Sequence, residues 1–202
     1  MGILFILLAS ACEEKKANVI DYSDVVQGSD RYNENDGDRV EVDIILAKDS
    51  TSIVQEAFIS NGIAVNSVQF LENRMFPERF SPNNIEKYQL NRVEDTIQFY
   101  NWTYSDSLQT MNSFFNWLDH FGEKGLSFQV GEEERMQVQP FYIFVGDTNL
   151  IFIESSLKLN EKEWENYLKS IGIESIHYFL KQNKYAKVQW YRYVDNKKEE
   201  LN

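Results

Sequence analysis

Residues 141–153 read FYIFVGDTNLIFI, and this stretch decides the fold. Phe141–Val145 and Leu150–Ile153 are apolar at every position, and the turn-forming residues Gly146-Asp147-Thr148-Asn149 separate them. Two apolar runs around such a turn predict a β-hairpin. Because neither run alternates with polar residues, we expect both arms to be central strands that are covered on both faces of the sheet.

Further strands are expected on both sides of this hairpin, where apolar residues alternate with polar ones or run together between turn signals. They are Arg39–Ala47, Ile85–Leu90, Thr96–Tyr104, two short strands within Gly125–Val138 around the acidic turn Gly131–Arg135, Ile176–Leu180 and Tyr185–Val194. Two segments stay open between helix and strand, namely Ala64–Met75 and the arm that begins near Ile176. Pro77 and Pro82 bracket an irregular segment between the first of these and the next strand.

Helices are expected where a capping residue precedes an apolar stripe and a glycine follows it. They begin after Asp49 or Ser50, after Ser105 or Asp106, and after Asn160, and they end at Gly62, Gly122 and Gly172. The second should be the core helix, with its stripe formed by Leu108, Met111, Phe114, Phe115, Leu118 and Phe121. The chain therefore predicts an α+β fold, a single domain whose mostly antiparallel sheet is built from hairpins, with about three packed helices.

The N-terminus, MGILFILLASACEEKK, has a different character. Ile3–Leu8 is an unbroken apolar run, far shorter than the roughly 20 residues that span a bilayer. Small residues and Cys12, the only cysteine of the chain, follow it. This layout resembles the signal and lipobox of bacterial lipoproteins, although Ala9 stands where that family prefers leucine and no positive segment precedes the run. The resemblance implies that residues 1–11 are a signal peptide and that Cys12 is lipidated; the alternative is a buried strand with a structural cysteine.

Glu13-Glu14-Lys15-Lys16 follows the cysteine. Acidic residues at this place resemble the surface-export signal of some Gram-negative lipoproteins. The resemblance implies a lipid anchor in the outer membrane with the domain on the cell surface, and a periplasm-facing position is the alternative. Residues 12–38 are polar and lack sustained periodicity, so we expect a lipidated cysteine and a flexible tether there. We expect one globular domain over residues 39–195 and a charged, frayed tail over residues 196–202.

The charge balance and the missing motifs exclude several function classes. The chain has 20 Lys and Arg against 32 Asp and Glu, a net charge of −12, which repels phosphate backbones and predicts no nucleic-acid partner. An EF-hand alignment with Gly37 at the sixth position puts Tyr32 at the first ligand position. Calcium needs a carboxylate or carbonyl oxygen there, so tyrosine does not fit. HExxH, CxxC, GxSxG and phosphate-loop motifs are also missing, so we expect no metal and no cofactor.

Aromatic residues are the candidate binding residues. Tyr100, Trp102 and Tyr104 share one face of an expected strand, where ring faces suit sugars or peptide side chains. The alternative is that they face a helix and belong to the core. Three triplets resemble the acceptor of a bacterial periplasmic O-glycosylation system, and helix capping is the alternative for two of them. The triplets are Asp49-Ser50-Thr51, Asp95-Thr96-Ile97 and Asp106-Ser107-Leu108.

The sequence best supports a membrane-anchored lipoprotein with a non-catalytic binding or assembly role at the bacterial cell envelope. Its partners would be the membrane, through the N-terminal lipid, and an envelope protein or glycan, while the oligomeric state stays open. Two alternatives remain. One is a carboxylate-based hydrolase acting on envelope glycans. The other is an immunity-type inhibitor that blocks a basic toxin with an acidic face.

Overall fold

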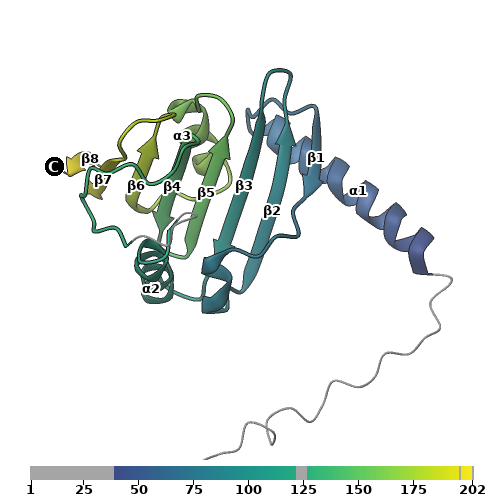
Figure 1. The fold of residues 1–202 in the computed structure, drawn as a ribbon. Helices are drawn as coiled ribbons and strands as arrows, with labels where there is room; N and C mark the ends of the chain where they lie inside the picture. The colour runs from purple at the N-terminus through teal and green to yellow at the C-terminus, as the bar shows by residue number, and fades with distance from the viewer. Residues whose placement is uncertain (1–38, 122–126, 196, 202) are drawn as a thin grey trace, which may run out of the picture. The chain divides into compact units, whose positions relative to one another are not determined.

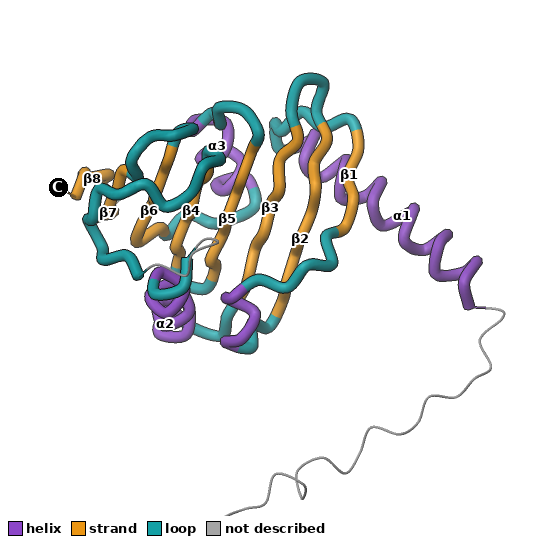
Figure 2. The backbone as a smooth tube through the Cα atoms, viewed as in Figure 1, coloured by secondary structure: helices purple, strands orange, loops and turns teal. Residues whose placement is uncertain are grey.

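An antiparallel sheet is the central feature of the computed structural model, which describes residues 39–121, 127–195 and 197–201 (Figures 1 and 2). The eight strands in these residues lie in the order β1-β2-β3-β5-β4-β6-β7-β8. Their bounds are Ser67–Phe70 (β1), Asn84–Asn91 (β2), Thr96–Thr103 (β3), Phe141–Gly146 (β4), Asn149–Ser155 (β5), Ile176–Gln182 (β6), Gln189–Val194 (β7) and Lys197–Leu201 (β8). The helical elements of the same residues are α1 (Arg39–Ser60), the 3-10 turn η2 (Phe76–Phe80), α2 (Ser107–Leu118) and α3 (Glu161–Ser170). The expected α+β fold is confirmed.

The predicted hairpin lies at the centre of the sheet. β4 and β5 pair antiparallel, with Phe141 opposite Glu154 and Val145 opposite Leu150. β3 lies beside β5 and β6 lies beside β4, so neither arm is an edge strand. Every residue of β4 is buried, because its side chains enter a core on each face of the sheet. This double cover explains why the hairpin contains so few polar residues.

Aromatic side chains fill both cores. On one face, Phe58 of α1 stacks on Tyr167 of α3 with centroids 5.0 Å apart. On the other face, Trp117 of α2 packs edge-on against Trp102 at 5.7 Å and Phe152 at 5.3 Å. Fully burying one such side chain stabilises the fold by roughly 1.5–3 kcal/mol. Both layers of helix over sheet are therefore held mainly by rings.

The starts of α2 and α3 follow the predicted capping residues, whereas α1 begins at Arg39 and not after Asp49 or Ser50. Asp106 accepts a hydrogen bond from the Gln109 amide at 2.8 Å and begins α2. Asn160 accepts one from the Glu163 amide at 3.4 Å and begins α3. Gly172 follows α3 with φ of +83°, a left-handed conformation that glycine adopts at helix C-termini. The structure also decides the two segments that stayed open between helix and strand. Ala64–Met75 contains the short strand β1, and Ile176 begins β6.

The predicted strand Arg39–Ala47 is wrong, because α1 runs without a break from Arg39 to Ser60. Val40, Val42 and Ile44 alternate with polar residues as a strand would, but Gly and Pro are missing between Arg39 and Asn61. Nothing in the sequence therefore stops the helix from extending toward the N-terminus, since adding a residue to a formed helix is easier than starting one.

Three further expectations need correction. No strand forms in the described part of Gly125–Val138; instead Phe128 and Met136 are buried from a loop over the α2 face. The tail is not frayed within 197–201, because β8 pairs with β7. The buried face of α2 is also rotated from the predicted stripe: Leu108 and Phe115 are 70% and 38% exposed, while Trp117 is buried. α2 ends at Leu118, and the residue predicted to end it lies outside the described residues.

Candidate functional site

A cleft of about 560 Å³ opens beside η2, and it is the candidate site. Its lining residues are Arg74, Met75, Phe76, Glu78, Arg79 and Ile85. Pro77 occupies the first turn of η2, where its fixed φ suits a helical start and its missing amide costs no hydrogen bond. Ser81 ends the turn with φ of 51°. The irregular segment expected around Pro77 is thus a formed turn that carries Arg79, and Arg74 lies just before it.

Buried hydroxyl groups hold the backbone of this turn. The Tyr104 hydroxyl donates to the Pro77 carbonyl at 2.9 Å and lies 2.6 Å from the Ser113 hydroxyl of α2. The Asn73 amide donates to the Tyr100 hydroxyl at 3.1 Å. Burial raises the pKa of Tyr104 to about 12, so this hydroxyl keeps its proton at neutral pH. The turn is tied in this way to β3 and α2.

Glu78 is neutralised within the cleft. Its carboxylate accepts hydrogen bonds from the Met75 amide and from Lys87 Nζ, both at 3.1 Å. Neither Arg74 nor Arg79 forms a salt bridge with any described residue. The cleft therefore presents two guanidinium groups whose charges are not paired within the described part of the chain.

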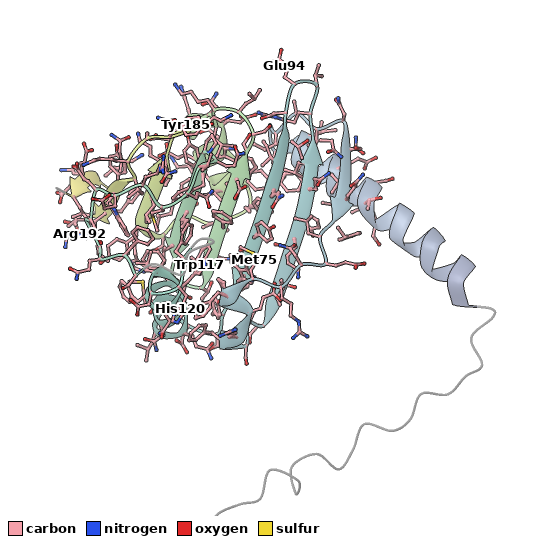
Figure 3. All side chains as sticks on the ribbon, viewed as in Figure 1. Met75, Glu94, Trp117, His120, Tyr185 and Arg192 are labelled. Carbon is pink, nitrogen blue, oxygen red and sulfur yellow. The ribbon has the colours of Figure 1, made fainter. Side chains whose placement is uncertain are left out.

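A stack of planar groups forms one wall of the cleft. The Phe76 ring lies 4.7 Å from the His120 ring at an interplanar angle of 15°. The Arg79 guanidinium lies 5.0 Å from the centre of the same Phe76 ring, which favours a cation over its face. Figure 3 shows His120 toward the end of the sheet opposite the end that carries Glu94. Contact with the Phe76 ring therefore restrains the exposed Arg79 side chain.

This arrangement can hold an anion. An arginine presents a planar fork of N–H donors that matches the oxygen atoms of a carboxylate or phosphate. Elsewhere the chain is acidic, with a net charge of −12, so a local excess of positive charge attracts anions that the rest of the surface repels. Only an indirect signal for this site is present in the sequence: Arg79 lies in the segment expected to be irregular, and Arg74 lies in the neighbouring segment that stays open between helix and strand.

The three predicted binding aromatics are in the core. Tyr100, Trp102 and Tyr104 are 1%, 0% and 2% exposed. Trp102 stacks on Tyr100 at 5.6 Å and meets Trp117 of α2, so no ring face is open to a partner in this structure. The core alternative is the one observed. Tyr104 nevertheless contributes to the cleft, because its hydroxyl holds the Pro77 carbonyl of the turn, while the Tyr100 hydroxyl bonds to the Asn73 side chain just before the turn.

The other predicted sites fall in different places. Cys12, the signal, the tether and the Tyr32–Gly37 stretch lie outside the described residues. Of the three acceptor-like triplets, Asp106-Ser107-Leu108 is exposed at the start of α2, whereas Asp95 and Ile97 of the second triplet are buried. Only the α2 triplet is thus shown to be wholly accessible among the described side chains.

A second charged cluster lies where α3 covers the sheet. Lys198 of β8 donates hydrogen bonds to Glu161 and to Glu165, the latter at 3.3 Å, and Lys181 of β6 donates to Glu161 at 2.9 Å. Burial acts to raise the pKa of Glu161, but the hydrogen bonds from Lys198 and Lys181 outweigh it and the pKa is lowered. These groups pair with one another, so the cluster joins α3 to the edge of the sheet. It borders a hollow of about 730 Å³.

Two described residues form a histidine–carboxylate pair of the kind that catalytic triads contain. His177 and Asp147 form an exposed pair with Nε2 and Oδ1 2.7 Å apart. A nucleophilic triad needs a hydroxyl or thiol at the other ring nitrogen, and no described serine or threonine hydroxyl is bonded there. The same residues contain no group of three His, Cys, Asp or Glu side chains that could hold a metal ion.

No family model, no curated protein and no solved structure matches this chain. Over residues 39–121, 127–195 and 197–201, no helix combines the length and the apolarity needed to cross a membrane.

Proposed function

We infer that the protein is a lipid-anchored, non-catalytic binding module of the bacterial cell envelope, and that the cleft beside η2 is its binding site. One observation carries the binding role: Arg74 and Arg79 place charges without a described carboxylate partner in one concave site. Ligand recognition needs donors that are fixed before the ligand arrives, and a few polar groups beside apolar walls. The hydrogen bond from the Tyr104 hydroxyl holds the Pro77 carbonyl of the turn, and the Phe76 ring lies 5.0 Å from the Arg79 guanidinium.

The N-terminal sequence supports the anchor. The apolar run, the small residues and the lone Cys12 resemble a lipoprotein signal, although Ala9 and the missing positive segment depart from it. Residues 13–38 would then act as a spacer, and a coil of about 25 residues has an r.m.s. span of about 25–30 Å. Such a spacer lets the domain search near the membrane for its partner.

The carboxyl groups favour binding over hydrolysis. A two-carboxylate hydrolase needs one acid whose pKa is raised. At three described carboxyl groups the pKa is lowered instead: at Asp95 by its hydrogen bond from Arg92, at Asp106 by the Gln109 amide, and at Glu161 by its lysine partners, which outweigh burial. The immunity-type alternative needs an acidic face, whereas the candidate cleft is basic.

A retention experiment tests the binding role. The full chain carrying Cys12→Ser is immobilised and exposed to fractionated envelope extract, beside an Arg74→Gln/Arg79→Gln double variant and the control Arg192→Gln. Arg192 lies on β7, in the other half of the sheet, and its change removes one charge without touching the cleft. We expect wild type and control to retain the same component and the double variant to lose it. Equal retention by the double variant would reject the cleft. Turnover of an envelope glycan or peptide that stops when one carboxylate is changed would reject the non-catalytic role.

A further inference from the structure

We propose that the cleft beside η2 takes a carboxylate that carries a short aliphatic group, such as the end of an acyl chain or of a peptide. The proposal rests on the binding role proposed above and adds the chemical class of the ligand. It follows from the charge, the wall and the size of the cleft.

The charge of the cleft selects an anion. Arg74 and Arg79 can each direct N–H donors at the two oxygen atoms of one carboxylate. Glu78 lines the same cleft, but its carboxylate is already bonded to Lys87 and to the Met75 amide, so the two arginines leave the cleft with a net positive charge. An apolar wall then distinguishes a carboxylate with an aliphatic group from a bare inorganic anion.

The apolar wall of the cleft is aliphatic. Ile85 is 39% exposed although it belongs to a strand, and Met75, which Figure 3 labels, also lines the cleft. A methionine side chain adapts its shape to an apolar group. The Phe76 ring is already in contact with His120 and Arg79, so it is not the open platform on which a sugar stacks. The wall therefore favours an aliphatic group over a glycan.

The size of the cleft limits how long the aliphatic group of the ligand can be. A volume of about 560 Å³ lies within the range of roughly 300–1,000 Å³ that small-molecule sites occupy. Both arginines are exposed, so the cleft is open on the side from which a chain end could enter. A carboxylate with several methylene groups fits these dimensions.

Calorimetric titration of the full chain carrying Cys12→Ser tests the proposal, with acetate, butyrate, octanoate and N-acetyl-leucine as probes. Affinity should rise by two- to fourfold for each added methylene, as expected for partial to full burial of that group. It should fall when the salt concentration is raised, because the arginines are exposed. Tighter binding of octanoate would identify an acyl chain as the source, and tighter binding of N-acetyl-leucine a peptide end; either supports the proposal.

Variants and other probes make the proposal easy to overturn. Arg74→Gln and Arg79→Gln should each weaken octanoate binding at least tenfold, as the loss of a charge-assisted hydrogen bond predicts. Ile85→Ser should remove the dependence on chain length, and the control Arg192→Gln should change nothing. Equal or tighter binding of 1-octanol, glucuronate or inorganic phosphate would overturn the ligand class. If no probe binds while the envelope component is still retained through the cleft, this inference fails and the binding role stands; loss of both rejects both.

Discussion

Asp95 is the buried charge that joins three parts of the fold. Its carboxylate accepts hydrogen bonds from Arg92 at 2.6 and 2.9 Å and from the Ser155 hydroxyl of β5 at 3.0 Å. Arg92 also lies 3.4 Å from Glu163 of α3. The turn between β2 and β3 is therefore fastened both to the central hairpin and to a covering helix.

Replacing Asp95 should destabilise the protein in a pH-dependent way. The hydrogen bond from Arg92 lowers the pKa of Asp95 below its unfolded value of about 3.9. The stability that ionised Asp95 contributes to the fold is then present at neutral pH and is lost as the pH falls through the lowered pKa. We expect Asp95→Asn to cost about 3 kcal/mol at pH 7, because it leaves Arg92 without its buried partner. Urea unfolding at pH 7 and at low pH measures this, with the exposed Glu94→Gln as control. Equal stability of Asp95→Asn and wild type at pH 7 would contradict the account.

Tyr104→Phe tests whether buried hydroxyls position the cleft. The change removes the hydrogen bond to the Pro77 carbonyl and should cost about 1–3 kcal/mol of stability. It should also weaken octanoate binding, because the turn loses one tie to β3. Tyr142→Phe is the matched control, since the Tyr142 hydroxyl is also buried and donates to the Leu159 carbonyl at 2.9 Å, away from the cleft. If both variants bind octanoate equally well, Tyr104 does not position the site.

At the scale of elements, the sequence was informative where chemistry and periodicity agreed. The central hairpin followed from two apolar runs around a turn, and the starts of α2 and α3 followed from Asp106 and Asn160. The prediction for Arg39–Ala47 failed because alternation over a short run suits a strand and yet does not prevent a helix from extending. The rotation of α2 could not be seen, because periodicity marks several apolar positions and only packing decides which of them meets the sheet.

The cleft itself was beyond prediction for a related reason. Arg74 lies just before η2 and Arg79 lies within it, and only the turn brings them to one cleft with Ile85 of the next strand. An irregular segment has no sequence periodicity from which the proximity of these three side chains could be predicted. The shared face of Tyr100, Trp102 and Tyr104 was predicted correctly, but their proposed binding role was not, because their spacing could not show that α2 covers that face.

β8 offers a prediction at the element scale. Lys198 contacts the Phe179 and Tyr191 rings at 4.1 and 4.5 Å, and Leu201 packs against the core that contains Trp190. Deleting residues 196–202 should lower stability by roughly 1–3 kcal/mol, since each lost cross-strand pair contributes about 0.2–1 kcal/mol. Circular dichroism melts measure the loss, with the exposed Lys197→Gln as control. An unchanged melting temperature would return this stretch to the status of a frayed tail.

At the scale of the whole molecule, buried tyrosines predict the behaviour of the domain in alkali. Burial raises the pKa values of Tyr88, Tyr104 and Tyr142 to about 12. Because the pKa of each tyrosine is higher in the folded protein, the stability that its protonated form contributes is fully present below the unfolded pKa of about 10. That contribution is lost as the pH rises through the folded pKa of about 12. Ultraviolet titration should therefore show tyrosines that stay protonated at about pH 11 in the native protein and ionise near pH 10 in denaturant. Complete ionisation of the native protein near pH 10 would contradict the packed cores.

The anchor is tested by fractionating cells. If Cys12 carries the lipid, the Cys12→Ser chain should leave the membrane fraction, and wild type should stay there in high salt, which dissociates surface ionic contacts but not a buried acyl chain. Ser10→Ala serves as the control, because it changes a neighbouring small residue and keeps the cysteine. A Cys12→Ser chain that still sediments with membranes in high salt would reject the lipid anchor.

One measurement tests the central claim, binding through the cleft, most directly. A photo-crosslinking amino acid replaces Ile85, the exposed strand residue on the wall of the cleft, in the full lipid-bearing chain in living cells. The same substitution at Val93, which is 86% exposed on the turn between β2 and β3, is the control. We predict that mass spectrometry finds an adduct at position 85 and none at position 93, and that Arg74→Gln/Arg79→Gln abolishes it. An empty position 85, or an adduct that persists without the two arginines, would contradict the account.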